Sequence, residues 1–219
     1  MKKIAVILSG CGSLDGAEIR ESVLALLALE QAGASYKIFA LNQDQYHVMN
    51  HLTGQESIGE KRNILQEAAR IARGAIEDIA NLNCDQFDGV VIPGGYGVAK
   101  NLCSFAFAGS QAAVNEQVLA KIRQFKQQRK PIGAICIAPA LVALAVGSDK
   151  PTLTIGTDSD VAKQIENTGA IHQPCVSAEC VVDSEHKIVS SPAYMHGDAT
   201  LLELYSGITK LVKKVVELA

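Results

Sequence analysis

The chain has 219 residues, of which 48% are hydrophobic and 20% charged, and its formal net charge at pH 7 is -3. This composition is typical of a folded globular protein, and the weak negative charge excludes the basic surface that nucleic-acid binding requires. We therefore expect no nucleic-acid partner. Because no linker-like stretch divides the chain, we expect a single domain over residues 1–219.

Short apolar runs that end at glycine or proline alternate with longer segments of helical period. This alternation is typical of an α/β fold in which helices cover both faces of a parallel sheet. The apolar runs predict strands at Lys3–Leu8, Ser35–Ala40, Gly89–Ile92, Pro131–Ile135 and Leu153–Ile155. The first run is too short to span a membrane, so we expect no membrane contact.

The helical period predicts six helices, with boundaries that depend on capping residues. They are Ala17–Ala32, Lys61–Ala72, Asn115–Gln128, Pro139–Ala145, Asp160–Asn167 and Ala199–Leu218. Near the C-terminus, Cys180–Val182 and Ile188–Ser190 bracket a turn and predict a small β-hairpin. Residues 42–60 show no clear period, and we expect an irregular surface excursion that serves as a lid or a subunit contact.

Six cysteines are scattered along the chain, which is long enough to fold without disulfides. We therefore expect a reducing compartment, the cytoplasm. There is no CxxC motif, so we expect no metal. No P-loop or GxGxxG motif is present either, and we expect no cofactor.

Cys136 is the strongest candidate for a reactive residue. It ends an apolar strand before a helix, and alanines at positions 134 and 138 leave room for a strained nucleophile elbow. The helix N-terminus favours a thiolate there, and Pro139 suits the first helical turn. The alternatives are a buried cysteine that only fills space, and Cys11 as the reactive thiol, since it also follows a strand at the same sheet edge.

Other loops at this edge supply candidate binding groups, because ligands bind beyond the carboxyl ends of parallel strands. In the loop from Pro93 to Gly97, Gly94 and Gly95 allow close backbone approach, so N–H groups of Gly95 and Ile137 predict an oxyanion site. The alternative is a simple tight turn. We also place Cys11, Thr157 and Asp158 at the substrate side; these residues come from loops that end other strands.

Several motifs together resemble the enhancing-lycopene-biosynthesis (ElbB-type) branch of the ThiJ/PfpI superfamily, which has a class I glutamine amidotransferase-like fold. The resemblance covers almost the whole chain. The segments that carry it are Ile7–Gly12 with Asp15-Gly16, His51–Gly54, Pro93–Gly97 through Leu102, Cys136–Pro139, Leu153–Asp158 and Ser191–Met195.

The resemblance implies a flavodoxin-like α/β sandwich, a homodimer, and weak glyoxalase activity without glutathione or metal. It also implies an acid in the first helix, which the sequence places at Glu21; Glu18 is the alternative, read otherwise as a solvated first-turn carboxylate. Two adjacent anions disfavour each other, so we predict a raised pKa for Glu21 and a lowered pKa for Cys136.

One departure from the superfamily affects catalysis. Gly156-Thr157-Asp158 stands where more active members carry a histidine beside the cysteine. His196 is the remaining candidate to face the pocket, although a surface histidine at a helix start is the alternative.

The function we predict is conversion of a small dicarbonyl, glyoxal or methylglyoxal, to glycolate or lactate. Cys136 attacks the aldehyde carbon and Glu21 moves the proton. Protein deglycation would use the same residues. The alternative is a redox-sensing or ligand-binding protein in which Cys136 is oxidised.

Overall fold

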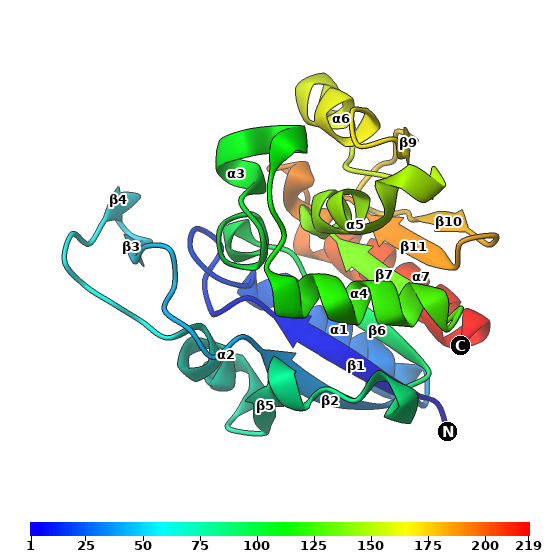
Figure 1. Cartoon of the computed structure of the whole chain (residues 1–219), viewed down its shortest axis with the longest axis horizontal. Coiled ribbons are helices and arrows are strands. Elements are labelled where there is room, and N and C mark those ends of the chain that lie inside the picture. The colour runs from blue at the N-terminus through cyan, green and yellow to red at the C-terminus, as the bar shows by residue number, and fades with distance from the viewer.

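A seven-stranded sheet forms the centre of the computed structural model, which describes all 219 residues (Figure 1). Its order is β10-β11-β7-β6-β1-β2-β5, and all neighbours are parallel except the β10–β11 pair. The strands are β1 (Lys3–Leu8), β2 (Ser35–Ala40), β5 (Ile76–Asp78), β6 (Gly89–Ile92), β7 (Ile132–Ile135), β10 (Val181–Asp183) and β11 (Ile188–Ser191). Both the predicted α/β parallel-sheet class and the C-terminal hairpin are confirmed.

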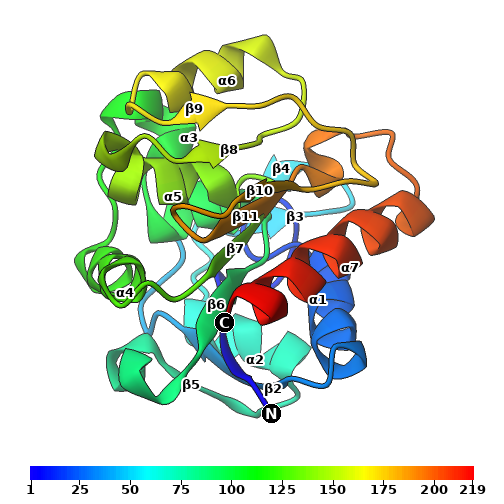
Figure 2. The ribbon, with the colours of Figure 1, turned by 90° about the vertical axis from the view of Figure 1, so that its right-hand side faces the viewer.

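Helices cover both faces of this sheet. The helices are α1 (Ile19–Gln31), α2 (Ile64–Ala72), α3 (Phe105–Ala108), α4 (Glu116–Gln127), α5 (Ala138–Val146), α6 (Ser159–Glu166) and α7 (Leu201–Leu218). Figure 2 shows α1 and α7 side by side on one face, with α4 and α5 on the other. Because both faces are covered, every residue of β6 and β7 is buried, which explains their unbroken apolar sequences.

Capping residues decide where the helices begin. Glu18, Asn63 and Thr200 hold extended backbone conformations, and their side chains accept hydrogen bonds from N–H groups in the first turn. The predicted helices from Ala17, Lys61 and Ala199 therefore start two or three residues later. Thr200 also forms a capping box with Glu203.

The fifth predicted strand lies outside the central sheet. Its observed form, β8 (Thr152–Leu153), pairs in parallel with β9 (Ile171–His172) as a separate two-stranded sheet. Thr152 N–H donates to the Asp183 carboxylate at 2.7 Å, and Thr154 N–H donates to the Ser190 hydroxyl at 2.9 Å. Side chains of the C-terminal hairpin thus accept hydrogen bonds from backbone N–H groups that a strand of the central sheet would donate to a neighbouring strand.

The segment predicted as an irregular excursion contains a short hairpin, β3 (Met49–Asn50) with β4 (Gln55–Glu56), which projects from the body in Figure 1. His47 and His51, four residues apart, bind different partners at its base. Nε2 of His47 lies 2.9 Å from Lys100 Nζ, and Nε2 of His51 accepts the N–H of Leu14 at 3.1 Å. The excursion is therefore held against the loop that follows β1.

Helix lengths and composition bear on membrane contact. None of the helices is both long enough and apolar enough to cross a bilayer.

Candidate active site

Cys136 occupies the sharp turn between β7 and α5. Its φ angle is 60°, in the left-handed region that non-glycine residues rarely adopt. Its N–H donates to the carbonyl of Ser191 at 2.8 Å, which continues the β7–β11 ladder, and α5 begins two residues later with Pro139 in its first turn. The backbone strain expected of a nucleophile elbow is present, and 7% of the residue is exposed.

Gly94 brings the β6 loop against this turn. A Cβ atom at Gly94 would lie 2.4 Å from the Cys136 Cβ, 2.7 Å from Glu21 Oε2 and 2.8 Å from the Ile135 carbonyl. These distances are too short for real Cβ contacts, so only glycine fits. The same geometry shows that Cys136 and Glu21 meet at this one glycine.

Glu21 lies on the inner face of α1 and is completely buried. Its Oε2 accepts the N–H of Gly94 at 3.0 Å, its Oε1 accepts the N–H of Tyr194 at 3.2 Å, and its carboxyl group is within hydrogen-bonding contact of the Cys136 thiol. Burial, followed by the charge of Glu18, raises the pKa of Glu21 to about 8. The predicted direction for Glu21 is confirmed.

The predicted pKa of Cys136 is wrong in direction. Burial raises the pKa of the Cys136 thiol well above its ordinary value, and the negative charge of Glu21 raises it further. Hydrogen bonds from Gly95 and Ile137 act in the opposite sense but do not reverse the shift. The free site therefore holds a neutral thiol, because the thiolate would lie in a desolvated position.

Two backbone donors point at the Cys136 sulfur. The N–H groups of Gly95 and Ile137 both face it, and neither has another acceptor in the structure. Gly95 has a φ of 96°, which turns its N–H toward the sulfur. The N–H of Gly94 is different, since it binds Glu21, so Gly94 serves close packing and not oxyanion binding.

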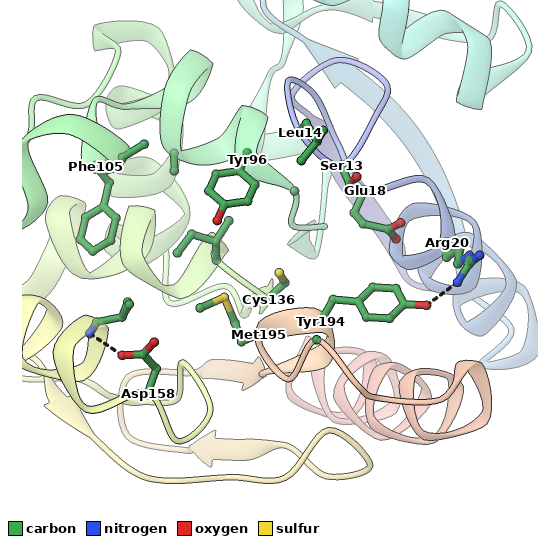
Figure 3. A pocket seen from close by; sticks show the side chains of 16 residues that line it. Ser13, Leu14, Glu18, Arg20, Tyr96, Phe105, Cys136, Asp158, Tyr194 and Met195 are labelled. Atoms are coloured by element: carbon green, nitrogen blue, oxygen red, sulfur yellow. Dashed lines mark hydrogen bonds between the residues drawn. The ribbon is translucent and has the colours of Figure 1, made fainter. Parts of the chain in front are cut away.

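A cavity of about 850 Å³ opens above Cys136 and is lined by 16 residues, 10 of them hydrophobic. Figure 3 shows Cys136 at its centre, with Tyr96, Phe105 and Asp158 on one side and Glu18, Arg20 and Tyr194 on the other. Arg20 donates to the Tyr194 hydroxyl at 2.8 Å, and both residues line that side of the cavity.

Glu18 is part of the cavity wall, not the solvated carboxylate of the alternative reading. Its Oε2 accepts the N–H of Glu21 at 2.6 Å as the α1 N-cap, and burial raises the pKa of Glu18. Its position at the start of α1 orients the turn that carries Glu21.

Three predicted or candidate site residues lie elsewhere. Cys11 is outside the cavity, near the charged side chains of α2, and burial raises the pKa of its thiol. Thr157 lines a separate cavity of about 460 Å³. His196 turns away, and its Nε2 lies 2.9 Å from the Cys175 carbonyl. None of these three side chains lines the cavity above Cys136, although Ser13 and Leu14 of the β1 loop and Asp158 of the β8 loop do.

Asp158 does line the cavity, but its carboxylate caps α6. Oδ1 accepts the N–H groups of Asp160 at 2.9 Å and Val161 at 3.1 Å. Its charge is therefore already engaged by the helix N-terminus.

Several cavity residues were not predicted from the sequence. Tyr96, Tyr194 and Met195 belong to motifs that carried the resemblance, and that was the available signal. Phe105 and Val161 enter from α3 and α6, and no local pattern marks them.

Known proteins resemble this chain over almost its whole length. A mitochondrial human protein, glutamine amidotransferase-like class 1 domain-containing protein 3, is 41% identical over 225 residues, which cover 99% of this chain and 83% of the relative. The ES1 protein homolog of Rattus norvegicus, also named mitochondrial, is 39% identical over 99% of this chain and 84% of its own length.

Solved structures show the same fold. An isoprenoid biosynthesis protein with an amidotransferase-like domain from Ehrlichia chaffeensis superposes with a TM-score of 0.92 at 40% identity, covering 100% of this chain and 99% of its own. Drosophila melanogaster DJ-1beta, at 21% identity and a TM-score of 0.55, shares the fold over 99% of this chain and 95% of its own. Residues 2–204 match the DJ-1/PfpI family, and the chain therefore belongs to that family.

Proposed function

We propose that this protein is a glutathione-independent glyoxalase that converts glyoxal to glycolate and methylglyoxal to lactate. The observation that carries the proposal is the buried contact between Cys136 and Glu21, beneath the two free N–H groups of Gly95 and Ile137. Membership of the DJ-1/PfpI family supports it.

The first step adds the Cys136 thiol to the aldehyde carbon. The carbon–sulfur bond forms, the carbon–oxygen π bond breaks, and the thiol proton goes to that oxygen, which the N–H groups of Gly95 and Ile137 stabilise. Because proton transfer accompanies addition, the raised pKa of Cys136 does not prevent it. The raised pKa does make the addition slow, because little of the more reactive thiolate is present.

The second step moves hydrogen between two carbons. Glu21 takes the proton from the sulfur-bearing carbon and returns one to the neighbouring carbon, and the hydroxyl proton on the first carbon passes to the oxygen of the second. The aldehyde carbon is thereby oxidised to a thioester as the second carbonyl is reduced to an alcohol. Water then hydrolyses the thioester and releases the hydroxy acid. A carboxyl group with a pKa of about 8 exchanges a proton readily near neutral pH.

No histidine lines the cavity, so Glu21 has no second proton carrier of that kind beside it. We therefore expect low turnover. Protein deglycation requires the same residues and belongs to the same proposal.

The test is the steady-state conversion of glyoxal to glycolate without glutathione or metal. Wild type is expected to show a saturable rate, and Cys136→Ala no rate above background. Cys11→Ala is the matched control, because it removes another thiol outside the cavity and should retain the rate. Equal rates for wild type and Cys136→Ala would refute the proposal.

A second candidate function is oxidation sensing by Cys136. The same two N–H groups that face the sulfur would stabilise oxygen atoms of a sulfinate, and no histidine is present to speed turnover. Mild peroxide followed by mass spectrometry separates the two functions. Sulfinate on Cys136 in a protein without saturable aldehyde kinetics would favour the sensor.

The finer affiliation, the compartment and the assembly are also proposals. The name of the Ehrlichia protein supports the enhancing-lycopene-biosynthesis branch. All six cysteines are free, which supports a reducing compartment such as the cytoplasm, although the curated animal relatives are named mitochondrial. Exposed apolar side chains on neighbouring helices α1 and α7 support a homodimer: Ile19, Val23, Leu27, Leu201 and Leu202.

A further inference from the structure

We propose that the preferred substrates are α-oxoaldehydes with an apolar substituent larger than methyl, so that glyoxal and methylglyoxal are poor members of the class. This inference rests on the proposed function and specifies its substrate. It follows from the volume of the cavity, the direction it opens from Cys136, and the character of its walls.

The cavity is much larger than a two- or three-carbon substrate needs. Its volume is about 850 Å³. Glyoxal has four heavy atoms and fills on the order of 100 Å³, taking about 30 Å³ for each water-sized group. A cavity of this volume is typical of sites for ligands with an extended body.

The buried acid fixes the direction in which a substituent leaves the reacting carbons. Glu21 is completely buried next to Gly94 and is not among the residues that line the cavity. The oxygen of the attacked carbon faces the N–H groups of Gly95 and Ile137. A substituent on the second carbon must therefore extend outward into the open cavity.

The walls beyond Cys136 on the side of α3 and α6 are apolar. Tyr96 and Phe105 line this arm, and Met195 lies next to Cys136 (Figure 3). Val161 of α6 also lines the cavity, and its N–H donates to Asp158 on this side. Asp158 is the carboxylate on this side, and its Oδ1 is engaged by the first turn of α6. An apolar group placed here displaces water without leaving a charged side chain unpaired.

The opposite arm has a different character. Glu18 and Arg20 line it, and the Arg20 guanidinium donates to Tyr194. The two arms thus distinguish the ends of a substrate, and the apolar arm receives the substituent.

The expected consequence is a rise of kcat/KM with substituent size. Each methylene group that becomes buried is worth about a fourfold gain. The experiment compares glyoxal, methylglyoxal, isopropylglyoxal and cyclohexylglyoxal with the full chain. We expect kcat/KM to rise roughly tenfold or more from methylglyoxal to cyclohexylglyoxal. This is less than the gain that complete burial of every added methylene group would give.

A variant that fills the apolar arm tests the location. Val161→Phe narrows the arm and is expected to lower the ratio of kcat/KM for cyclohexylglyoxal over methylglyoxal by about tenfold. Val182→Phe is the matched control, because Val182 lies partly exposed on β10 and outside the cavity. Its ratio should equal that of wild type.

A second readout is independent of turnover. Simple aldehydes without a second carbonyl, acetaldehyde and cyclohexanecarbaldehyde, are tested for protection of Cys136 against alkylation. The larger aldehyde could protect Cys136 more strongly in a protein that turns over no α-oxoaldehyde. That result would support the preference of the cavity for apolar substituents and refute the proposed glyoxalase activity. Turnover that is flat or falls with substituent size would refute the preference and leave the glyoxalase standing. Absence of both turnover and protection refutes both.

Discussion

Glu21 is an ionisable group placed where water does not reach it. Burial and the charge of Glu18 raise its pKa from 4.5 to about 8. The folded protein therefore holds a proton that the unfolded chain releases between these two pH values. Stability from this group is fully present below pH 4.5 and is lost as pH rises through about 8.

This linkage predicts the behaviour of Glu21→Gln. Between pH 4.5 and 8 wild type should lose about 5 kcal/mol relative to the variant, from about 1.4 kcal/mol for each pH unit. The measurement is the free energy of unfolding in urea for both proteins across this range. A difference that does not change with pH would show that Glu21 is ionised in the folded state.

Gly94 gives a second prediction for a single residue. Gly94→Ala pushes a methyl group against Cys136 and Glu21, so we expect glyoxalase activity to fall about 100-fold and the free energy of unfolding to fall by about 1 to 3 kcal/mol. Gly197→Ala is the steric control, because nothing lies within 4 Å of a Cβ there. Its unfolding free energy should stay within about 0.5 kcal/mol of wild type.

Among the elements, the segment Val98–Leu102 joins three parts of the chain through Asn101. The Asn101 amide donates to the carbonyls of Ser9 and Asp15, both at 2.9 Å, and its Oδ1 accepts the N–H of Tyr46 at 2.9 Å. One buried side chain therefore connects the β1 loop, the excursion and the π-helical turn that follows the β6 loop.

Asn101→Asp tests this connection. The carboxylate keeps an acceptor for Tyr46 but faces two carbonyl oxygens without a proton to donate, so we expect a loss of about 3 kcal/mol. Hydrogen exchange should also quicken across residues 42–60. Asn81→Asp, at an exposed position without such contacts, serves as the control. Equal stability and exchange in the two variants would contradict the role of Asn101.

For the molecule as a whole, the apolar residues exposed on α1 and α7 predict its assembly. The double variant Val23→Glu with Leu202→Glu places charges in the proposed interface and should convert a dimer to a monomer. Light scattering coupled to size exclusion measures the mass. Leu52→Glu is the control, since Leu52 is 95% exposed on the separate β3–β4 hairpin. A wild-type monomer would refute the homodimer.

The central strands β1, β6 and β7 could be predicted because they are buried on both faces and read as continuous apolar runs. The edge strand β5 was not predicted, because it is only half-buried and carries Glu77 and Asp78. The elbow at Cys136 was equally visible, since small neighbours at fixed spacing are a local requirement. By contrast, β8 was misplaced because side chains of Asp183 and Ser190 bind its backbone, and those residues are distant in the sequence.

The rest of the site depends on three-dimensional placement. Cys11 follows a strand at the correct edge, yet its thiol lies near charged side chains of α2, whereas Ser13 and Leu14 of the same loop line the cavity. Nothing in the motif encodes which residue of the loop faces Cys136. The pKa of Cys136 depends on how completely the thiol is buried. The helix start and the motif indicate the interactions that stabilise a thiolate at Cys136. The desolvation that opposes the thiolate can be recognised only in the folded chain.

At position 136, folding and catalysis require different residues, because the backbone there is left-handed. A residue with a Cβ atom in this conformation costs roughly 1 kcal/mol or more relative to glycine. Selection for stability alone would favour glycine at this turn, whereas selection for a nucleophile retains cysteine. Mutational tolerance at position 136 should consequently differ between a screen for folded protein and a screen for turnover.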